Sequence, residues 1–197
     1  MEYICNMFII GVVGQIASGK GILVKYLIEK LGFISYSLSS AVHREIEKKG
    51  IKKYTRQMLQ DMGDELRREF GDEVLAQRII KAINEKKKDK IVIEGIRNPG
   101  EIEFLRNNSN FILIGVKAIR KLRYKRLLIR GKKWDPKTYE EFLIVDKRDI
   151  GIDQNNSGQQ VGKCLAYCDY VLTNNKDLKD FQRKVERLMG KLLNIKS

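Results

Sequence analysis

One short segment limits the folds open to this chain more than any other. Residues 14–21 read GQIASGKG, a glycine-rich run with the spacing G-x-x-x-x-G-K. It follows an apolar, β-branched run at 8–13 and precedes apolar residues at helical spacing between 21 and 31. A buried strand, a glycine loop and an amphipathic helix in this order predict a strand–loop–helix unit. Such a unit points successive backbone N–H groups at phosphate oxygens, with the positive end of the helix dipole behind them.

This phosphate loop, residues 14–21, is expected to bind the phosphates of ATP, with Lys20 reaching the β- and γ-phosphates. The predicted nucleotide-binding residues are Gly14, Gln15, Ile16, Ala17, Ser18, Gly19, Lys20, Gly21 and Ile22. The Ser or Thr that usually follows the lysine and binds Mg²⁺ is replaced here by Gly21 and Ile22. We expect Mg²⁺ to rest on nucleotide phosphates, waters and a carboxylate, since this ion keeps several waters in most sites.

The rest of the chain alternates between short apolar runs and helical patterns. Strand-like runs lie at 8–13, 33–37, 90–95, 111–116 and 170–173. Helical patterns lie at 39–84, where Gly50, Gly63 and Gly71 are expected to separate three or four helices, and at 100–106, 118–130, 136–148 and 178–193. The alternation predicts an α/β fold of three layers (αβα), with a five-stranded parallel sheet between two layers of helices. Ligands of such sheets bind beyond the carboxyl ends of the strands.

Composition bounds the size and partners of the fold. A chain of 197 residues, 43% hydrophobic, suits one domain over 1–197. Lys and Arg number 39 against 25 Asp and Glu, a net charge of +14 that would attract anions. Nucleic acid is neither excluded nor favoured as a partner, because the lysines are scattered and no zinc-finger or aromatic RNA-binding signature accompanies them.

Cysteine, histidine and hydropathy patterns exclude other classes. Cys5, Cys164 and Cys168 lack metal-site spacing and are expected to be free thiols in a reducing compartment. His43 is the only histidine, which argues against catalytic triads and multi-histidine metal sites. The apolar run near the N-terminus is too short for a membrane span. We expect a cytoplasmic monomer or homodimer without a membrane partner.

A second chemical feature follows the strand at 90–95. Glu94 stands at its end, where a carboxylate can orient the waters of Mg²⁺. Arg97 follows three residues later, and its planar guanidinium could clamp the phosphate of an acceptor. The ordinary alternative is a strand-to-helix turn with charged surface residues.

Three segments carry a resemblance to known families. Residues 92–101, VIEGIRNPGE, resemble the Asp-x-Arg-x-x-Asn-Glu segment of phage-type deoxynucleoside monophosphate kinases, whose upstream helical motif is echoed by Arg56, Gln60, Gly63 and Arg67. Gly19-Lys20-Gly21 resembles the Gly-Lys-Gly-Thr of adenylate kinases, although Ile22 replaces the Thr. Residues 169–175 are similar to the last strand and adenine-side loop of dephospho-CoA kinases.

These families share the P-loop kinase fold, so the resemblance covers nearly the whole chain. It implies an ATP- and Mg²⁺-dependent phosphotransferase with an acceptor-binding helical insert at about 38–85 and a small helical lid at about 120–150. It also implies roles by position. The acceptor side would use Ser39, Arg44, Arg56, Arg67 and Arg97; catalysis would use Lys20, Glu94, Arg126, Arg130 and Arg148; Asn174 would border the adenine. Ser39 as a helix N-cap and a basic, solvated lid helix are the ordinary alternatives.

The motifs come from several subfamilies, so three functions stay open. The leading hypothesis is transfer of the γ-phosphoryl group of ATP to a nucleoside or deoxynucleoside monophosphate, a small phosphorylated acceptor. A dephospho-CoA kinase-like enzyme would phosphorylate a hydroxyl and needs a carboxylate base, and no clear Asp follows the second strand. A non-catalytic regulatory module would explain the missing hydroxyl after Lys20, but not the lid arginines. The polar segment 155–163 is interpreted as a binding loop without an assigned ligand.

Overall fold

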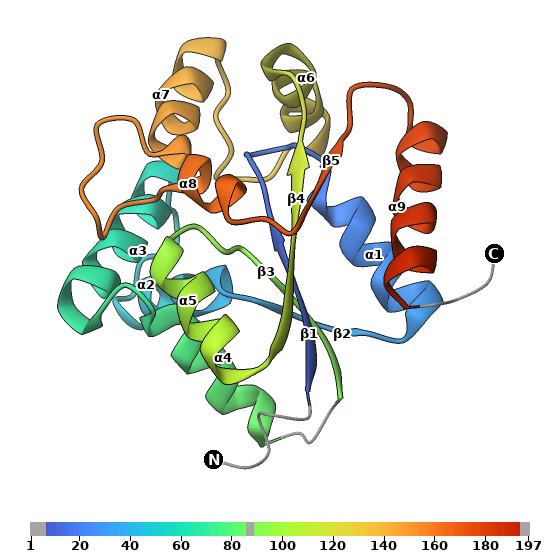
Figure 1. Cartoon of the computed structure of the whole chain (residues 1–197). Coiled ribbons are helices and arrows are strands. Elements are labelled where there is room, and N and C mark those ends of the chain that lie inside the picture. Colours follow the sequence, from blue (N-terminus) through green and yellow to red (C-terminus); the bar gives the residue numbers. More distant parts are fainter. Residues whose placement is uncertain (1–6, 86–88, 194–197) are drawn as a thin grey trace.

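The computed structural model describes residues 7–85 and 89–193. A twisted sheet runs through the centre, with helices on both of its faces (Figure 1). Cys5 and both ends of the predicted domain 1–197 lie outside the described residues. Cys164 and Cys168 are free thiols.

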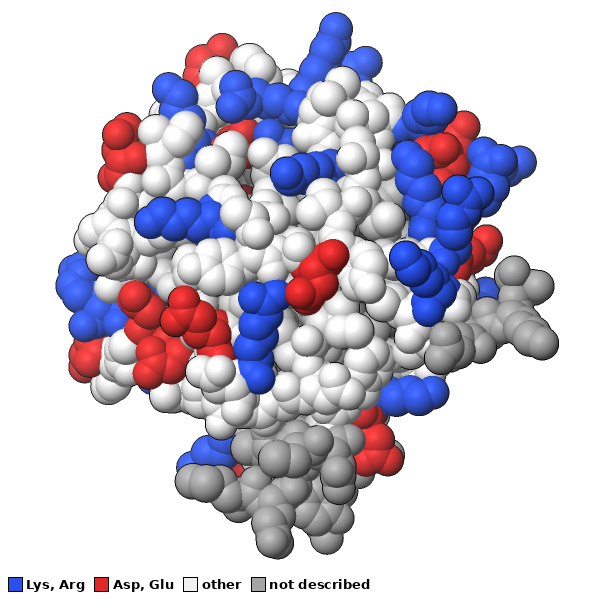
Figure 2. Space-filling view, viewed as in Figure 1, with Lys and Arg blue, Asp and Glu red and all other residues white. Residues whose placement is uncertain are grey.

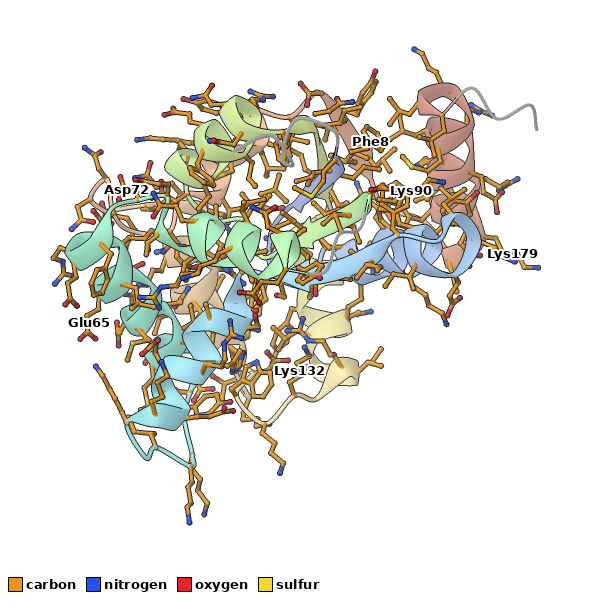
Figure 3. All side chains as sticks on the ribbon, turned by 90° about the horizontal axis from the view of Figure 1, so that it is seen from below. Phe8, Glu65, Asp72, Lys90, Lys132 and Lys179 are labelled. Carbon is orange, nitrogen blue, oxygen red and sulfur yellow. The ribbon has the colours of Figure 1, made fainter. Side chains whose placement is uncertain are left out.

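The sheet has the predicted five parallel strands. They are β1 (Phe8–Val13), β2 (Ile34–Ser37), β3 (Lys90–Glu94), β4 (Asn110–Lys117) and β5 (Tyr170–Thr173), in the order β2-β3-β1-β4-β5. Figure 3 shows the amino ends of β1 and β3 near each other at Phe8 and Lys90, which pair in the sheet. Because β1 lies in the centre and is covered on both faces, its sequence is a continuous apolar run.

Alternate residues of β1 enter two separate cores. Ile10 and Val12 pack with α1 (Lys20–Leu31) and α9 (Leu178–Leu192) on one face. Ile9 and Val13 pack on the other face with α2 (Ser39–Lys48), α3 (Arg56–Phe70), α4 (Val74–Asn84), α5 (Pro99–Asn108) and α8 (Val161–Ala166). The three-layer αβα prediction is therefore confirmed (Figure 1).

The helical stretch 39–84 forms three helices, and one predicted break is wrong. Gly50 and Gly71 lie at helix ends with φ of +74° and +98°, a conformation that favours glycine. Gly63 lies inside α3 instead. A Cβ there would lie 3.4 Å from the Arg67 guanidinium, an ordinary van der Waals contact, so this glycine is neither a break nor required by packing.

The segment predicted to form a lid, which we call the lid, consists of α6 (Arg120–Arg130), the loop 131–138 and α7 (Tyr139–Ile150), and it lies above the carboxyl ends of the strands (Figure 1). Ile16 of the phosphate loop packs with Leu127, Phe142 and Val145 of the lid in a third apolar cluster. The segment 155–163, expected to be a loop, turns helical at Val161, where α8 begins.

On the face seen in Figure 2, basic residues are spread out rather than gathered in one field. Figure 2 shows lysines and arginines dispersed over the face seen in Figure 1, with a denser group on the side of α9. Acidic residues are interspersed among them, as Glu186 is among the basic residues of α9. In the described part of the chain, every helix is too short or too polar to cross a membrane.

Candidate functional site

The phosphate loop connects β1 to α1, and its backbone leaves no room for side chains at two glycines. A Cβ on Gly14 would lie 2.2 Å from the carbonyl oxygen of Val116. Gly19 has φ +105°, and a Cβ there would lie 2.2 Å from Nδ2 of Asn174. Only glycine meets both demands, so the spacing recognised in the sequence has a steric cause in the fold.

Lys20, the first residue of α1, folds back over the loop. Its Nζ donates to the carbonyl oxygens of Gly14, at 2.5 Å, and Gln15, at 2.9 Å. Burial lowers the pKa of Lys20 to about 7, against the opposing attraction of the Asp149 carboxylate. Arg97, Glu94 and Arg130 also act on this amine, so the structure brings four predicted site residues together at the mouth of the loop.

Glu94 ends β3, the neighbour of β1, and is half-buried. Its carboxylate forms no hydrogen bond or ion pair with any residue that the structure describes. A free carboxylate beside the phosphate loop is a ligand type that Mg²⁺ prefers, so Glu94 fits the predicted metal role through water. No cluster of three His, Cys, Asp or Glu able to hold a metal alone occurs among the described residues.

Asp149 is the residue that sequence reasoning missed. It lies near the end of α7, is 2% exposed, and accepts a hydrogen bond at 3.2 Å from the backbone N–H of Ile16. Its other oxygen pairs with Arg97. This carboxylate therefore joins the phosphate loop, the lid and the turn after β3. The only signal in the sequence is the charged run 146–149, in which the catalytic role is predicted for the neighbouring Arg148.

Arg148 does not belong to the group around Lys20. Its guanidinium pairs with Asp61 and Asp64 of α3, each at 2.6 Å. Adjacent helical residues point about 100° apart, so Arg148 and Asp149 cannot face the same partner. The structure thus gives Arg148 a role in holding the lid on α3.

A cavity opens between α2, α3 and the turn after β3; we call it the α2–α3 cavity. Its volume is about 30 Å³, room for on the order of one or two water molecules, so it is far smaller as it stands than the cavities that hold small molecules. Its polar lining consists of Ser39, His43, Arg56, Gln60, Arg67, Arg97 and Gln159. Four of the five predicted acceptor residues are therefore brought together. Ser39 does not act as an N-cap: α2 begins at Ser39, and the hydroxyl contacts that of Ser37 at 2.9 Å.

Arg44 is the exception. It is exposed on the outer side of α2, in a hollow shared with Lys48 and Arg78. His43, one position earlier, lines the α2–α3 cavity and contacts Tyr54 and the lid residue Trp134. The sequence alone did not show which face of α2 points to the cavity. In the structure that face carries His43, and Arg44 lies outside it.

Asp135 of the lid loop joins two of the predicted arginines. It is 5% exposed and accepts from Nε and Nη2 of Arg130, at 2.9 and 2.8 Å, in a bidentate pair. It also accepts from Arg56 of α3 at 3.1 Å. The lid is thereby connected to the wall of the α2–α3 cavity through one carboxylate shared by two guanidinium groups.

Arg67 lines the cavity, but its guanidinium is paired with a buried carboxylate, Glu101. It is 2% exposed and donates twice to Oε1 of Glu101, at 3.1 and 2.8 Å. Oε2 of Glu101 accepts from the backbone N–H groups of Arg97 and Asn98, at 2.7 and 3.1 Å. This buried network fixes the turn that carries Arg97, so the contacts of Arg67 are structural.

Arg126 and Asn174 meet behind the phosphate loop. Arg126 donates to the backbone and side-chain oxygens of Asn174, at 3.0 and 3.2 Å. Nδ2 of Asn174 donates to the carbonyl of Ser18 at 3.0 Å, and Asn174 is 2% exposed. The pair braces the loop from β5 and α6.

Comparisons with known proteins agree with this geometry. The AAA domain family matches residues 13–141. A UPF0200 protein of Pyrococcus horikoshii is 35% identical over 94% of this chain and 97% of its own length, and one of Methanothermobacter thermautotrophicus is 30% identical over 95% and 92%.

Solved structures share the fold. A shikimate kinase of Bacteroides thetaiotaomicron has a TM-score of 0.59 at 14% identity, covering 96% of this chain and 99% of its own. A dephospho-CoA kinase of Campylobacter jejuni has a TM-score of 0.51 at 17% identity, covering 93% and 96%. At these identities the likeness shows a P-loop kinase fold and leaves the acceptor open.

Proposed function

We propose, from the premise that this chain belongs to the UPF0200 family and has a P-loop kinase fold, that it transfers the γ-phosphoryl group of ATP to a nucleoside or deoxynucleoside monophosphate. One observation carries the proposal: Asp149 accepts a hydrogen bond from Ile16 of the phosphate loop and pairs with Arg97, which lines the α2–α3 cavity. A donor site and a cation-lined cavity therefore meet at one point beyond the carboxyl ends of the strands.

The donor would be held by the phosphate loop. The loop amides and the N-terminus of α1 favour negative charge, and Lys20 would exchange its bonds to Gly14 and Gln15 for phosphate oxygens. Glu94 would hold Mg²⁺ through water, and the ion would neutralise charge on the phosphates. Arg130, which also acts on Lys20, is placed to add positive charge from the lid.

The acceptor would bind at the α2–α3 cavity with its phosphate toward Arg97, and the cavity would have to widen by movement of α2, α3 or the lid, because as it stands it is too small for a nucleotide. In the transfer, an acceptor phosphate oxygen bonds to the γ-phosphorus, the bond from that phosphorus to the β-phosphate oxygen breaks, and ADP leaves. No general base is needed, because the attacking phosphate oxygen is already ionised. Positioning and charge neutralisation are the protein's main contributions, and lid closure excludes the water that would hydrolyse ATP.

A hydroxyl acceptor is the second candidate, and Asp149 favours it. Such an acceptor needs a carboxylate to take its proton, and the sequence offered none after the second strand. Asp149 supplies a buried carboxylate between Ile16 of the phosphate loop and Arg97 of the cavity. Both of its oxygens are engaged, one by Arg97 and the other by the backbone N–H of Ile16, so it is not free to receive the proton of an acceptor, which places this candidate second.

The test is an ADP-release assay with ATP, Mg²⁺ and a panel of acceptors: each ribonucleoside and deoxyribonucleoside monophosphate, shikimate and dephospho-CoA. We expect turnover with a monophosphate, and Lys20→Ala should reduce it by about 10²–10³-fold, the loss typical of one stabilising donor. Turnover only with a hydroxyl acceptor would favour the second candidate. ATP binding without any acceptor-dependent turnover would contradict both candidates and favour a regulatory module.

A further inference from the structure

Two glutamine side chains from distant parts of the chain meet in the wall of the α2–α3 cavity. Gln60 comes from α3 and Gln159 from the segment before α8. They are 2% and 3% exposed, and both line the cavity. Nε2 of Gln60 donates to Oε1 of Gln159 at 3.3 Å, which gives the segment 155–163 a contact with the cavity.

The neighbours of this carboxamide pair fix which way each amide points. Arg97 can only donate, and its Nη1 lies 3.3 Å from Gln159, so Gln159 must present Oε1 there. The carbonyl oxygen of Val145 can only accept, and it lies 3.2 Å from Gln60, so Gln60 must present Nε2. Flipping either amide would set two acceptors or two donors against each other. The orientation therefore follows from chemistry.

This orientation leaves one strong acceptor without a partner. Oε1 of Gln60 is buried and forms no hydrogen bond with any residue that the structure describes. A buried polar atom left unpaired costs about 1–3 kcal/mol. The side chain of Gln60 lines the cavity. It is linked to Arg97 through Gln159, because Gln60 and Arg97 both donate to Oε1 of Gln159.

We propose that Oε1 of Gln60 accepts a hydrogen bond from an O–H or N–H group of the acceptor, close to the anionic group that Arg97 holds. The acceptor class is then a small anion with a neighbouring hydrogen-bond donor. In a nucleoside monophosphate the donor is either a sugar hydroxyl or a base N–H. Gln159 is a positioning residue, since it holds the Gln60 amide in register with Arg97. This inference rests on the proposed use of the cavity as the acceptor site.

Such a site would discriminate strongly between acceptors. A site built to hydrogen-bond a substrate group rejects the analogue that lacks it, because the protein group is left buried and unpaired. The same hydrogen bond should therefore be lost whether the O–H or N–H group is removed from the acceptor molecule or Oε1 is removed from Gln60. The losses of binding free energy from the two changes should not add when both changes are made together.

The experiment is calorimetric binding of mononucleotides in the presence of a non-hydrolysable ATP analogue. The probes are the four ribonucleoside monophosphates and their 2′-deoxy counterparts, with wild-type protein, Gln60→Leu, Gln159→Leu and the exposed control Gln77→Leu. For the tightest probe we expect Gln60→Leu to weaken binding about tenfold or more, Gln159→Leu to weaken it a few-fold, and Gln77→Leu to leave it unchanged. Affinity for the ATP analogue should stay within twofold.

The two sources of the donor are separated by the probes. If the sugar supplies it, removal of the 2′-hydroxyl weakens binding to wild type and has no further effect in Gln60→Leu. If the base supplies the hydrogen-bond donor, wild type binds some bases more tightly than others, and this difference is absent in Gln60→Leu. The wild-type comparison needs no variant, so it stands even where Gln60→Leu unfolds.

The inference would be overturned if no mononucleotide binds wild type, if Gln60→Leu binds all probes as wild type does, or if it weakens all probes and the ATP analogue equally. If wild type binds mononucleotides and Gln60→Leu binds them equally well, the inference fails while the kinase proposal stands. Absence of mononucleotide binding to wild type would remove both. Tight, Gln60-dependent binding without ADP release would leave the recognition intact and remove the activity.

Discussion

The two sides of the candidate site are built in different ways. The phosphate loop is made of backbone: its glycines are required by steric contact, and its one cation, Lys20, bonds to carbonyls of its own loop. The acceptor and lid side is made of long side chains, and its arginines pair with carboxylates from other elements. These pairs are Arg56 and Arg130 with Asp135, Arg67 with Glu101, Arg97 with Asp149, and Arg148 with Asp61 and Asp64.

The difference has an electrostatic cause. Backbone amides carry partial charges that need no counter-ion, so a loop can present them in advance at no cost in desolvated charge. Guanidinium groups in a half-buried wall need a partner, because an unpaired buried charge is strongly unfavourable. We infer that the donor side is preorganised, whereas an acceptor anion must compete with carboxylates. The following predictions test this contrast, from the largest expected effect to the smallest.

Arg67 should matter for the fold more than for substrate. Arg67→Met leaves the buried Glu101 carboxylate without its ionic partner, and we expect the free energy of unfolding to fall by about 3–5 kcal/mol. Arg68→Met, the exposed neighbour on α3, should change it by about 0.5 kcal/mol or less. Chemical denaturation measures both. A stable Arg67→Met protein that has lost only acceptor affinity would show that Arg67 belongs to the substrate site instead.

Gly19→Ala should damage the backbone-built side. The residue has φ +105° and no room for a Cβ beside Asn174, so we expect a loss of about 1–3 kcal/mol in stability and at least tenfold in ATP affinity. Gly21→Ala is the matched control, because a Cβ there meets nothing within 4 Å. Thermal unfolding and calorimetric ATP titration report both effects. Equal behaviour of the two variants would refute the steric account.

Asp135→Asn should make acceptor binding easier. The change removes the carboxylate that Arg56 and Arg130 share, so an anionic acceptor meets less competition. We expect a few-fold tighter binding of the preferred mononucleotide, a gain of about 1 kcal/mol, with a less stable lid. Asp153→Asn, on an exposed loop, is the control. Weaker binding of the mononucleotide to Asp135→Asn would mean that Asp135 orients the arginines for the acceptor and does not compete with it.

The smallest expected effect is the uptake of a proton by Lys20 when ATP binds. Because the pKa of Lys20 is lowered to about 7, the amine is mostly neutral at pH 8. Phosphate favours the charged form and raises this pKa, so ATP binding should take up about one proton at pH 8 and almost none at pH 6. Affinity should correspondingly weaken as the pH rises above 7. Calorimetry in buffers of different ionisation enthalpy counts the protons, and Lys20→Met should abolish the uptake at pH 8.

Local patterns were sufficient for the framework. The five strands, the phosphate loop and the order of helices could be predicted because each depends on residues that are close in sequence: β-branched runs, glycines that backbone geometry requires, and helical periodicity. Glu94 and Arg97 were found for the same reason, since the end of a parallel strand is a site that short spacing reveals.

Tertiary structure decided the rest, because side-chain partners far apart in sequence cannot be inferred from local spacing. Helical phase put His43 and Asp149 inward and left Arg44 and Arg148 elsewhere. Gly63 lies inside α3 although its sequence position suggested a break, and the segment between α7 and α8 brings Gln159 to Gln60, 99 residues away. The sequence by itself determined where phosphate chemistry could occur, through local backbone geometry. Only the fold decided which charges meet there, since burial makes the arginines of the cavity wall, Arg56, Arg67 and Arg97, depend on carboxylates from other elements.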